Sequence, residues 1–151
     1  YGELDKASPM ANAIIDYRTV KSIETTEDLS AALDRFLNDK TRNKTLAKVY
    51  QAVRIEVNAE MSTLEQMLEQ ATNLLKPEGR LVVMSYHSLE DRLVKNLIQT
   101  GNVAGERVTD HFGNLPQVYK AINKKPMVAS AEEILTNTRA RSAKLRIAAR
   151  I

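Results

Sequence analysis

A polar run, Ser85-Tyr-His-Ser-Leu-Glu-Asp-Arg92, begins where a short apolar stretch over residues 80–85 ends. A continuous apolar run just after a Pro-Glu-Gly turn is typical of a buried strand in a parallel sheet. Ligands of open α/β sheets bind at the carboxyl ends of strands, so the polar groups here are directed at a site. We therefore expect this segment to carry the chemistry of the molecule.

Within this segment, a helix cap explains some residues and leaves others unexplained. Ser88 is expected to cap the following helix, with Asp91 as its reciprocal partner in a capping box. His87 is not needed for that cap, and its role is either proton exchange or that of a hydrogen-bonding spacer. A triad of Ser85, His87 and Asp91 is discounted because the residues lie too close in sequence, and the chain has no nucleophile elbow.

Cationic and amide side chains elsewhere could contact a nucleic acid. Arg54 and Asn58 are four residues apart and share a helix face, which suits either a solvated helix or contact with a base edge or phosphate. Arg92 is placed to pair with a neighbouring acid or to reach a phosphate. Further cations lie near turns in the last third of the chain, where they suit an RNA backbone: Lys124, Lys125, Arg139, Arg141, Lys144, Arg146 and Arg150.

Composition excludes several classes of protein. The 151 residues are 43% hydrophobic and carry a net charge of +3, which fits a packed, mildly basic chain. With no cysteine, two histidines and no HExxH motif, a metal site is not expected. No stretch approaches the roughly 18 apolar residues of a membrane helix, so neither a membrane nor a secretory pathway is expected, and the cytoplasm is the predicted location.

The hydrophobic periodicity predicts helices first and a small sheet afterwards. The order is an α-helical layer followed by the final part of an α/β fold. A Ser8-Pro9 pair is expected to start the first helix, and residues 25–28 are expected to start the second. The third helical stretch is either one continuous helix or two helices interrupted at Asn58. The expected helices cover residues 8–18, 25–37, 44–75, 88–99 and 131–135, and the expected strands cover 80–85, 118–122 and 144–149.

Three segments together resemble the RsmH/MraW-type ribosomal RNA cytosine-N4 methyltransferases. They are VYQAVRIEVNAEM at 49–61, GRLVVMSYHSLEDRLVK at 79–95, and NKKPMVASAEEILTNTRARSAKLRIAAR at 123–150. The resemblance covers essentially the whole chain and rests chiefly on the strings SYHSLEDR and RARSAKLR. Tyr50 and Tyr86 stand where the family usually has Phe, and residues 43–48 replace a stretch that commonly contains His-Pro.

The resemblance implies a fold class and a division into domains. The fold would be a helix-rich α/β arrangement, in which a helical insert domain at 1–75 recognises substrate. Residues 76–151 would supply a partial, about three-stranded sheet from the end of a seven-stranded SAM-methyltransferase fold. The glycine-rich SAM loop of the family is not in this sequence. The resemblance therefore implies S-adenosyl-L-methionine as cofactor of the complete enzyme, with no cofactor-binding residues in this C-terminal part.

The resemblance also implies a reaction, a partner and roles for residues. The complete enzyme would methylate N4 of a cytosine in 16S ribosomal RNA within the small ribosomal subunit, and this part alone would be inactive. His87 and Ser85 are the candidate catalytic residues, facing the base. The candidate RNA contacts are Arg54, Asn58, Ser88, Arg92, Lys124, Lys125, Arg139, Arg141 and Lys144.

Two alternatives remain open from the sequence. The first is a non-catalytic RNA-binding or helical interaction module, which the basic C-terminus and helical first half would also fit. The second concerns whether the chain self-associates. The outer edge of the strand at 80–85 would lack its neighbouring strand, and an exposed apolar edge tends to pair with another strand. We expect that edge to be covered by a second copy of the chain or by a rearranged helix, and a homodimer through the helical domain is a further possibility.

Overall fold

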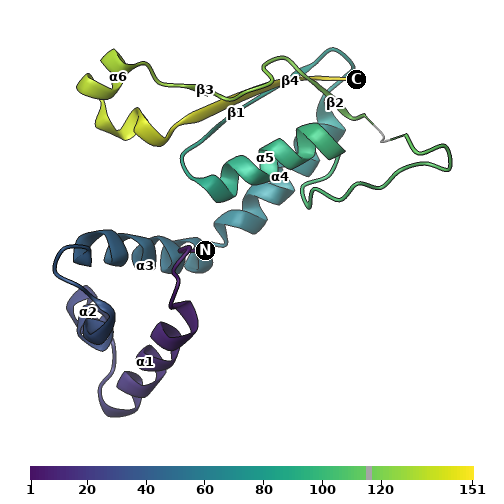
Figure 1. Cartoon of the computed structure of the whole chain (residues 1–151). Helices are drawn as coiled ribbons and strands as arrows, with labels where there is room; N and C mark the ends of the chain where they lie inside the picture. Colours follow the sequence, from purple (N-terminus) through teal and green to yellow (C-terminus); the bar gives the residue numbers. More distant parts are fainter. Residues whose placement is uncertain (115–116) are drawn as a thin grey trace. The chain divides into compact units, whose positions relative to one another are not determined.

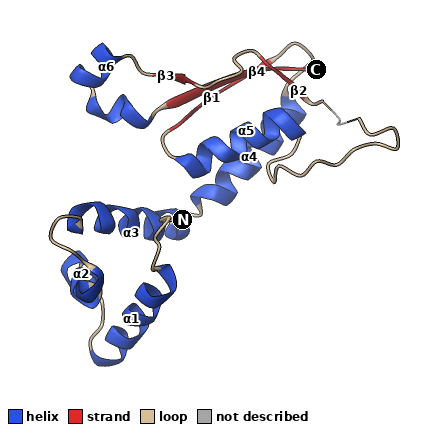
Figure 2. Cartoon of the chain, viewed as in Figure 1, coloured by secondary structure: helices blue, strands red, loops and turns tan. Residues whose placement is uncertain are grey.

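The computed structural model describes residues 1–114 and 117–151, which form two compact units, Tyr1–Glu60 and Met61–Ile151. Figure 1 follows the chain from the helices of the first unit to the sheet of the second. Figure 2 shows that every strand belongs to the second unit. The order of a helical part followed by a mixed part agrees with the sequence prediction.

The first unit is built from three α-helices and a short 3-10 helix around a small core. Met10, Leu33 and Val49 are buried at its centre, with Leu4, Ile14, Leu29, Phe36 and Leu37 packed around them. Each buried residue comes from a different segment, so the core joins the helices to one another. The elements are α1 (Ala7–Val20), α2 (Thr26–Ala32), η1 (Asp34–Phe36) and α3 (Arg42–Val57).

One predicted helix start in this unit is confirmed and another is wrong. The helix start predicted at residues 25–28 is present, and Thr25 is the N-cap of α2, with a side chain that forms a capping box with Asp28. The predicted cap at Ser8 is wrong, because α1 begins one residue before it, at Ala7. Its N-cap is Lys6, which makes no side-chain capping bond.

The long helical pattern after residue 44 is broken near Asn58, one of the two outcomes left open by the sequence. Asn58 is the C-cap of α3, and its N–H donates to the carbonyl of Arg54. Ala59 then adopts a left-handed conformation with φ of 50°. A residue in the left-handed region cannot continue a right-handed helix, so α3 ends before this residue and α4 (Glu60–Leu74) begins after it.

The second unit contains a four-stranded antiparallel sheet in which β4 is central. Strand β1 (Arg80–Ser85) pairs with β4 (Lys144–Arg150) along its whole length, with Ser85 opposite Lys144. Strands β2 (Tyr119–Ala121) and β3 (Met127–Val128) pair with opposite ends of β4. The remaining elements are α5 (Ser88–Thr100), α6 (Ala131–Thr136) and η2 (Thr138–Ser142).

Two predictions about the sheet need correction. The strand at 80–85 was expected to be a buried strand of a parallel sheet, but its partner among the described residues is antiparallel. Val82 and Met84 are 56% and 52% exposed, so only one face of β1 is buried. The sheet also has one more strand than expected, because the two residues of β3 are too few to leave a periodic signal in the sequence.

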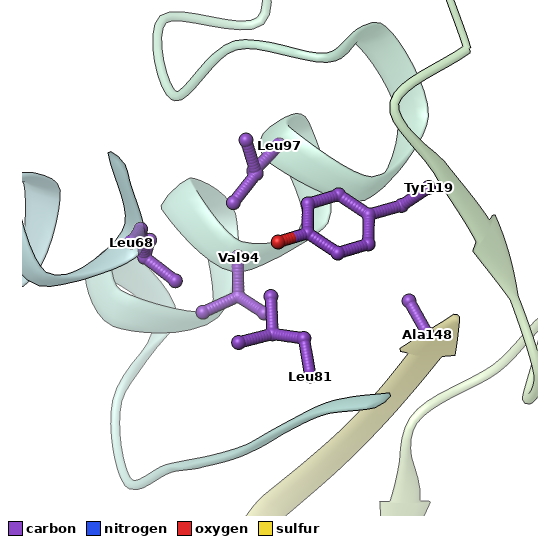
Figure 3. Packing of buried hydrophobic residues seen from close by; sticks show 6 residues of the cluster. All are labelled: Leu68, Leu81, Val94, Leu97, Tyr119 and Ala148. Atoms are coloured by element: carbon purple, nitrogen blue, oxygen red, sulfur yellow. The ribbon is translucent and has the colours of Figure 1, made fainter. Parts of the chain in front are cut away.

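Helices α4 and α5 pack against one face of this sheet. Leu68 of α4 and Val94 of α5 are fully buried and meet Leu81 of β1 and Ala148 of β4. Figure 3 shows the ring of Tyr119 reaching from β2 into the same cluster. Its hydroxyl lies 3.0 Å from Thr72 Oγ1 on α4. These contacts place α4 with the sheet, and the division into compact units falls between Glu60 and Met61. The division at residue 75 into an insert domain and a methyltransferase part stays a prediction.

The side chain of Asn123 bridges the gap between β2 and β3. Its Oδ1 accepts from the N–H of Ile147 at 2.7 Å, and its Nδ2 donates to the carbonyl of Leu145 at 3.0 Å. The amide thus takes the place of a strand residue beside β4. The bridge leaves the next two residues, Lys124 and Lys125, exposed in the turn.

The outer edge of β1 carries no further strand within the described residues. Whether a second copy of the chain or a helix covers that edge stays a prediction. Among the described helices, none is long and apolar enough to cross a membrane.

Candidate functional site

The turn between β1 and α5 is organised by a capping box one residue earlier than predicted. His87, not Ser88, is the N-cap of α5, and Nδ1 of His87 accepts from the N–H of Glu90 at 3.4 Å. Glu90 Oε2 accepts from the N–H groups of Tyr86 at 2.8 Å and His87 at 3.3 Å. The predicted Ser88–Asp91 box is therefore wrong, because Ser88 is already the first residue of the helix.

Both nitrogens of the His87 ring lie against Glu90. Since Nδ1 accepts a hydrogen bond, a neutral ring carries its proton on Nε2. That nitrogen is buried and makes no hydrogen bond among the described residues. Glu90 Oε1 is 3.2 Å from it, close enough for an ion pair when the ring is protonated but outside hydrogen-bonding geometry. The ring thus has no free basic nitrogen to offer a substrate in this arrangement.

Asp91, which the sequence suggested as a capping residue, forms a buried ion pair with the central strand. Arg146 Nε lies 2.7 Å from Oδ1 and Arg146 Nη2 lies 3.1 Å from Oδ2. Lys144 Nζ lies 3.5 Å from the same carboxylate. The hydrogen bonds from Arg146, aided by its charge and that of Lys144, hold the pKa of Asp91 below its usual value although burial opposes this. The pair ties the first turn of α5 to β4 beneath the His87 turn.

A hollow of about 610 Å³ opens beside the carboxyl end of β1. Its floor is apolar and includes Met84, Leu145 and Ala140, and its polar lining comes from Glu133, Asn137 and Arg139. Tyr86 contributes an aromatic ring that is 55% exposed. A hollow with an apolar floor, one exposed ring and few polar groups has the character of a ligand site.

The structure brings part of the predicted site together at this end of the sheet. Ser85, His87 and Ser88 lie within four residues of one another at the β1–α5 turn, and Lys144 lies opposite Ser85 in the strand register. Ser85 is only 2% exposed, so its hydroxyl is not presented at the surface. Arg139 lines the hollow beside Tyr86, while Arg92 and Arg141 are exposed on α5 and η2.

Arg54 and Asn58 belong to the first unit, and the structure gives them a local role. Arg54 donates to both carboxylate oxygens of Glu60, at 2.8 and 3.0 Å. Asn58 Nδ2 donates to the same carboxylate at 3.2 Å. These bonds span the break between α3 and α4, which gives both residues a structural function at that junction.

The basic C-terminal run is not a uniform cationic face. Arg146 is 9% exposed and neutralised by Asp91. The Arg150 guanidinium lies over the ring of Tyr119, 5.9 Å from its centroid, and donates to the carbonyl of Val118 at 2.9 Å. Alternation along β4 turns these side chains toward α5 and the core. The exposed cations of the run are Arg139 and Arg141.

Tyr86 is the residue of this site that sequence reasoning missed. The signal that could have found it is an aromatic side chain placed directly after a predicted strand, where the alternation of the strand turns it to the surface. As for metals, no cluster of three or more potential ligand side chains occurs in residues 1–114 and 117–151.

Comparison with known proteins places this chain in a family. The profile of the MraW methylase family matches residues 1–151. The chain belongs to the MraW methylase family. It is 51% identical over 148 residues to a protein of Phocaeicola vulgatus named ribosomal RNA small subunit methyltransferase H, covering 98% of this chain and 49% of the relative.

Other relatives carry the same name. The Flavobacterium johnsoniae protein is 50% identical over 151 residues, with 100% of this chain and 50% of the relative covered. The Amoebophilus asiaticus protein is 50% identical over 150 residues, with 99% of this chain and 48% of the relative covered. The chain thus spans about half the length of the curated relatives it matches.

Proposed function

We propose that this chain is the C-terminal part of a SAM-dependent methyltransferase that modifies N4 of a cytosine in 16S ribosomal RNA. The observation that carries the proposal is about 50% identity, over nearly the whole chain, to proteins named ribosomal RNA small subunit methyltransferase H. The polar turn after β1 and the hollow beside it support a substrate site in this part. The partner would be the small ribosomal subunit, and the site of action the cytoplasm.

The residues at the β1–α5 turn do not by themselves fit S-adenosyl-L-methionine. A SAM site needs a carboxylate free to hold the ribose hydroxyls, but Glu90 is engaged in the capping box and Asp91 in the ion pair. Since the resemblance places the glycine-rich SAM loop of the family outside this sequence, we assign the main cofactor contacts of the complete enzyme to residues outside this chain. On this proposal, residues 1–151 alone do not methylate RNA.

The contribution of this chain is to hold the target base. Cytosine N4 is a weak nucleophile because its lone pair is delocalised into the ring, so catalysis depends on positioning and desolvation. The exposed ring of Tyr86 offers a face on which a base can stack, as aromatic side chains do in RNA-binding proteins. Arg139, on the lining of the same hollow, is available to a phosphate or to the base edge.

His87 and Ser85 then act by shaping the turn. The capping box fixes the backbone on both sides of Tyr86, because Glu90 accepts from the N–H groups of Tyr86 and His87. Buried Ser85 ends β1 immediately before the ring. In this proposal His87 is a positioning residue and not the base that removes the N4 proton.

The test uses the complete enzyme, transfer of a labelled methyl group to 16S rRNA in small subunits, and paired variants of Tyr86. Tyr86→Phe keeps the ring, and we expect activity within about threefold of the parent. Tyr86→Ala removes a stacking contact typically worth about 1–3 kcal/mol, so we expect kcat/KM to fall roughly 5- to 150-fold. Equal activity of the Ala and Phe variants would remove Tyr86 from the site. Absence of methylation by the complete parent enzyme would contradict the proposed function itself.

The alternative of a non-catalytic RNA-binding module makes a different prediction. It requires RNA affinity without SAM-dependent methyl transfer by the complete reading frame. The same assay therefore separates the two functions, since methylation at cytosine N4, identified by mass spectrometry of nucleosides, belongs only to the enzyme.

A further inference from the structure

A second hollow, of about 540 Å³, lies at the opposite end of α5 from the His87 turn. It is formed by the C-terminal half of α5, the loop that follows, and β2, and we refer to it as the Arg107 hollow. Its lining residues are Lys95, Asn96, Ile98, Gln99, Thr100, Gly105, Arg107, Gln117, Tyr119, Lys120 and Ala121. Nothing in the site described above uses these residues.

The lining of the Arg107 hollow is positively charged. Lys95, Arg107 and Lys120 come from a helix, a loop and a strand, respectively, and none of the described residues lining the hollow is Asp or Glu. Across the described parts of the chain, none of the three forms an ion pair. The nearest acid in sequence, Glu106, lines a neighbouring hollow. Three unneutralised cations around one concave surface raise the local affinity for an anion.

The loop that carries Arg107 is held in place by two asparagine side chains. Asn96 Nδ2 donates to the carbonyl of Val103 at 3.0 Å. Asn102 accepts from the N–H of Glu106 at 3.0 Å and donates to its carbonyl at 2.7 Å. Arg107 therefore follows a residue whose backbone N–H and carbonyl are both hydrogen-bonded, so the backbone from which its side chain enters the hollow is held in place.

Gly105 fits the same arrangement. Its φ of +79° lies in the left-handed region, and a Cβ at this position would lie 2.6 Å from Asn96 Nδ2. A side chain at residue 105 would strain the backbone and push aside the Asn96 amide, which holds the loop through the carbonyl of Val103. A substitution of Gly105 would therefore distort the hollow without changing its charge.

We propose that the Arg107 hollow binds a backbone phosphate of RNA, at a nucleotide other than the one that is methylated. The choice of RNA rests on the proposed function, whereas the anion site rests on the geometry alone. Beside the cations, the side-chain amides of Gln99 and Gln117 supply polar groups that suit a sugar-phosphate backbone. At a rise of 1.5 Å per residue, Lys95 to Thr100 lie roughly 10–18 Å along α5 from Ser88, which separates this phosphate from the target base.

The experiment uses the 151-residue chain and a short 16S rRNA segment, with affinity measured by fluorescence anisotropy at several salt concentrations. The site variant combines Lys95→Gln, Arg107→Gln and Lys120→Gln. The matched control combines Lys6→Gln, Lys40→Gln and Lys76→Gln, exposed lysines outside the hollow, and removes the same charge. Each phosphate contact contributes about 0.7–0.9 to the slope of log K against log salt, so loss of the one proposed contact should lower the slope by about 0.7–0.9 in the site variant. The control should leave the slope within about 0.5 of the parent.

Two further measurements keep the anion site and the RNA separate. Inorganic phosphate, titrated at constant ionic strength, should shift the amide resonances of residues 95–107 and 117–121 in the parent but not in the site variant. Gly105→Ala keeps every charge and should weaken both phosphate and RNA binding, with folding checked by circular dichroism.

Equal losses of RNA affinity in the site variant and the control would overturn the proposal, as would phosphate shifts that map elsewhere. If phosphate shifts the hollow but the parent binds no RNA, the anion site stands and the RNA assignment of the hollow is rejected, whereas the proposed function is decided separately by methyl transfer with the complete enzyme. If a polyglutamate peptide displaces the phosphate while RNA does not, the partner is an acidic protein and the proposal is wrong.

Discussion

Replacing Asp91 by Asn should destabilise the second unit severely, because it leaves Arg146 buried without its counter-ion. The two side chains are 11% and 10% exposed and share two hydrogen bonds, at 2.7 and 3.1 Å. Asparagine offers one acceptor oxygen where the carboxylate offered two, and it directs an NH₂ group at the guanidinium. Breaking a buried pair by removing one partner typically costs about 3–5 kcal/mol. Lys144 also loses the carboxylate, but its side chain is 39% exposed and water can solvate it, so it adds little and we expect the lower end, about 3 kcal/mol.

That loss is large compared with the roughly 5–15 kcal/mol that stabilises a typical domain. With a urea m-value of about 1–3 kcal/mol/M, the unfolding midpoint should fall by about 1–3 M. The assay is urea unfolding followed through the amide resonances of Leu81 and Ala148, which report on the buried core of the second unit. Glu69→Gln, an exposed neutralisation on α4, is the matched control and should stay within about 0.5 kcal/mol of the parent.

A double variant distinguishes loss of the pair from loss of charge in general. Asp91→Leu with Arg146→Met replaces both ions by apolar side chains and should recover much of the stability lost in Asp91→Asn. A destabilisation below about 1 kcal/mol in Asp91→Asn would refute the reasoning, because it would show that Arg146 finds water or another partner. So would a double variant no more stable than the sum of the two single changes predicts.

Two further outcomes are expected. Hydrogen bonding to Lys21, with further bonds from the backbone N–H of Glu24 and from Thr25, lowers the pKa of Asp28 to about 2 from 3.8. The depressed pKa means that Asp28 stabilises α2 above about pH 4 and loses this effect as the pH falls toward 2; carboxyl ¹³C shifts of Asp28 that titrate near 3.8 would contradict this. His87→Asn keeps a good N-cap, so rRNA methylation by the complete enzyme should stay within a few-fold, whereas His87→Ala should cost about 0.5–2 kcal/mol of stability in urea unfolding. A folded Asn variant slowed by 100-fold or more would instead make His87 a proton-transferring residue.

The sequence by itself determined most of the elements of this protein. The apolar run at 80–85, the stripe of α5 and the alternation of β4 predicted a strand, a helix and a strand, and all three are present. The caps at Thr25 and Ser130 were also predictable, because a capping side chain and the N–H it binds lie within three residues of each other. The resemblance carried by SYHSLEDR and RARSAKLR gave the family.

Only the tertiary structure decided what the charged residues of those two strings do. Asp91 looked like a local cap and Arg146 like a phosphate contact, yet they bind each other across 55 positions of sequence. The capping box forms between His87 and Glu90 and not between Ser88 and Asp91. The start of α5 depends on where the pairing of β1 with β4 ends, which the residue type of Ser88 does not determine. Both side chains are buried, and a buried ion is stable only beside an ion of opposite charge. The fold supplies that partner from a distant segment, so the long-range pair forms in place of a local one.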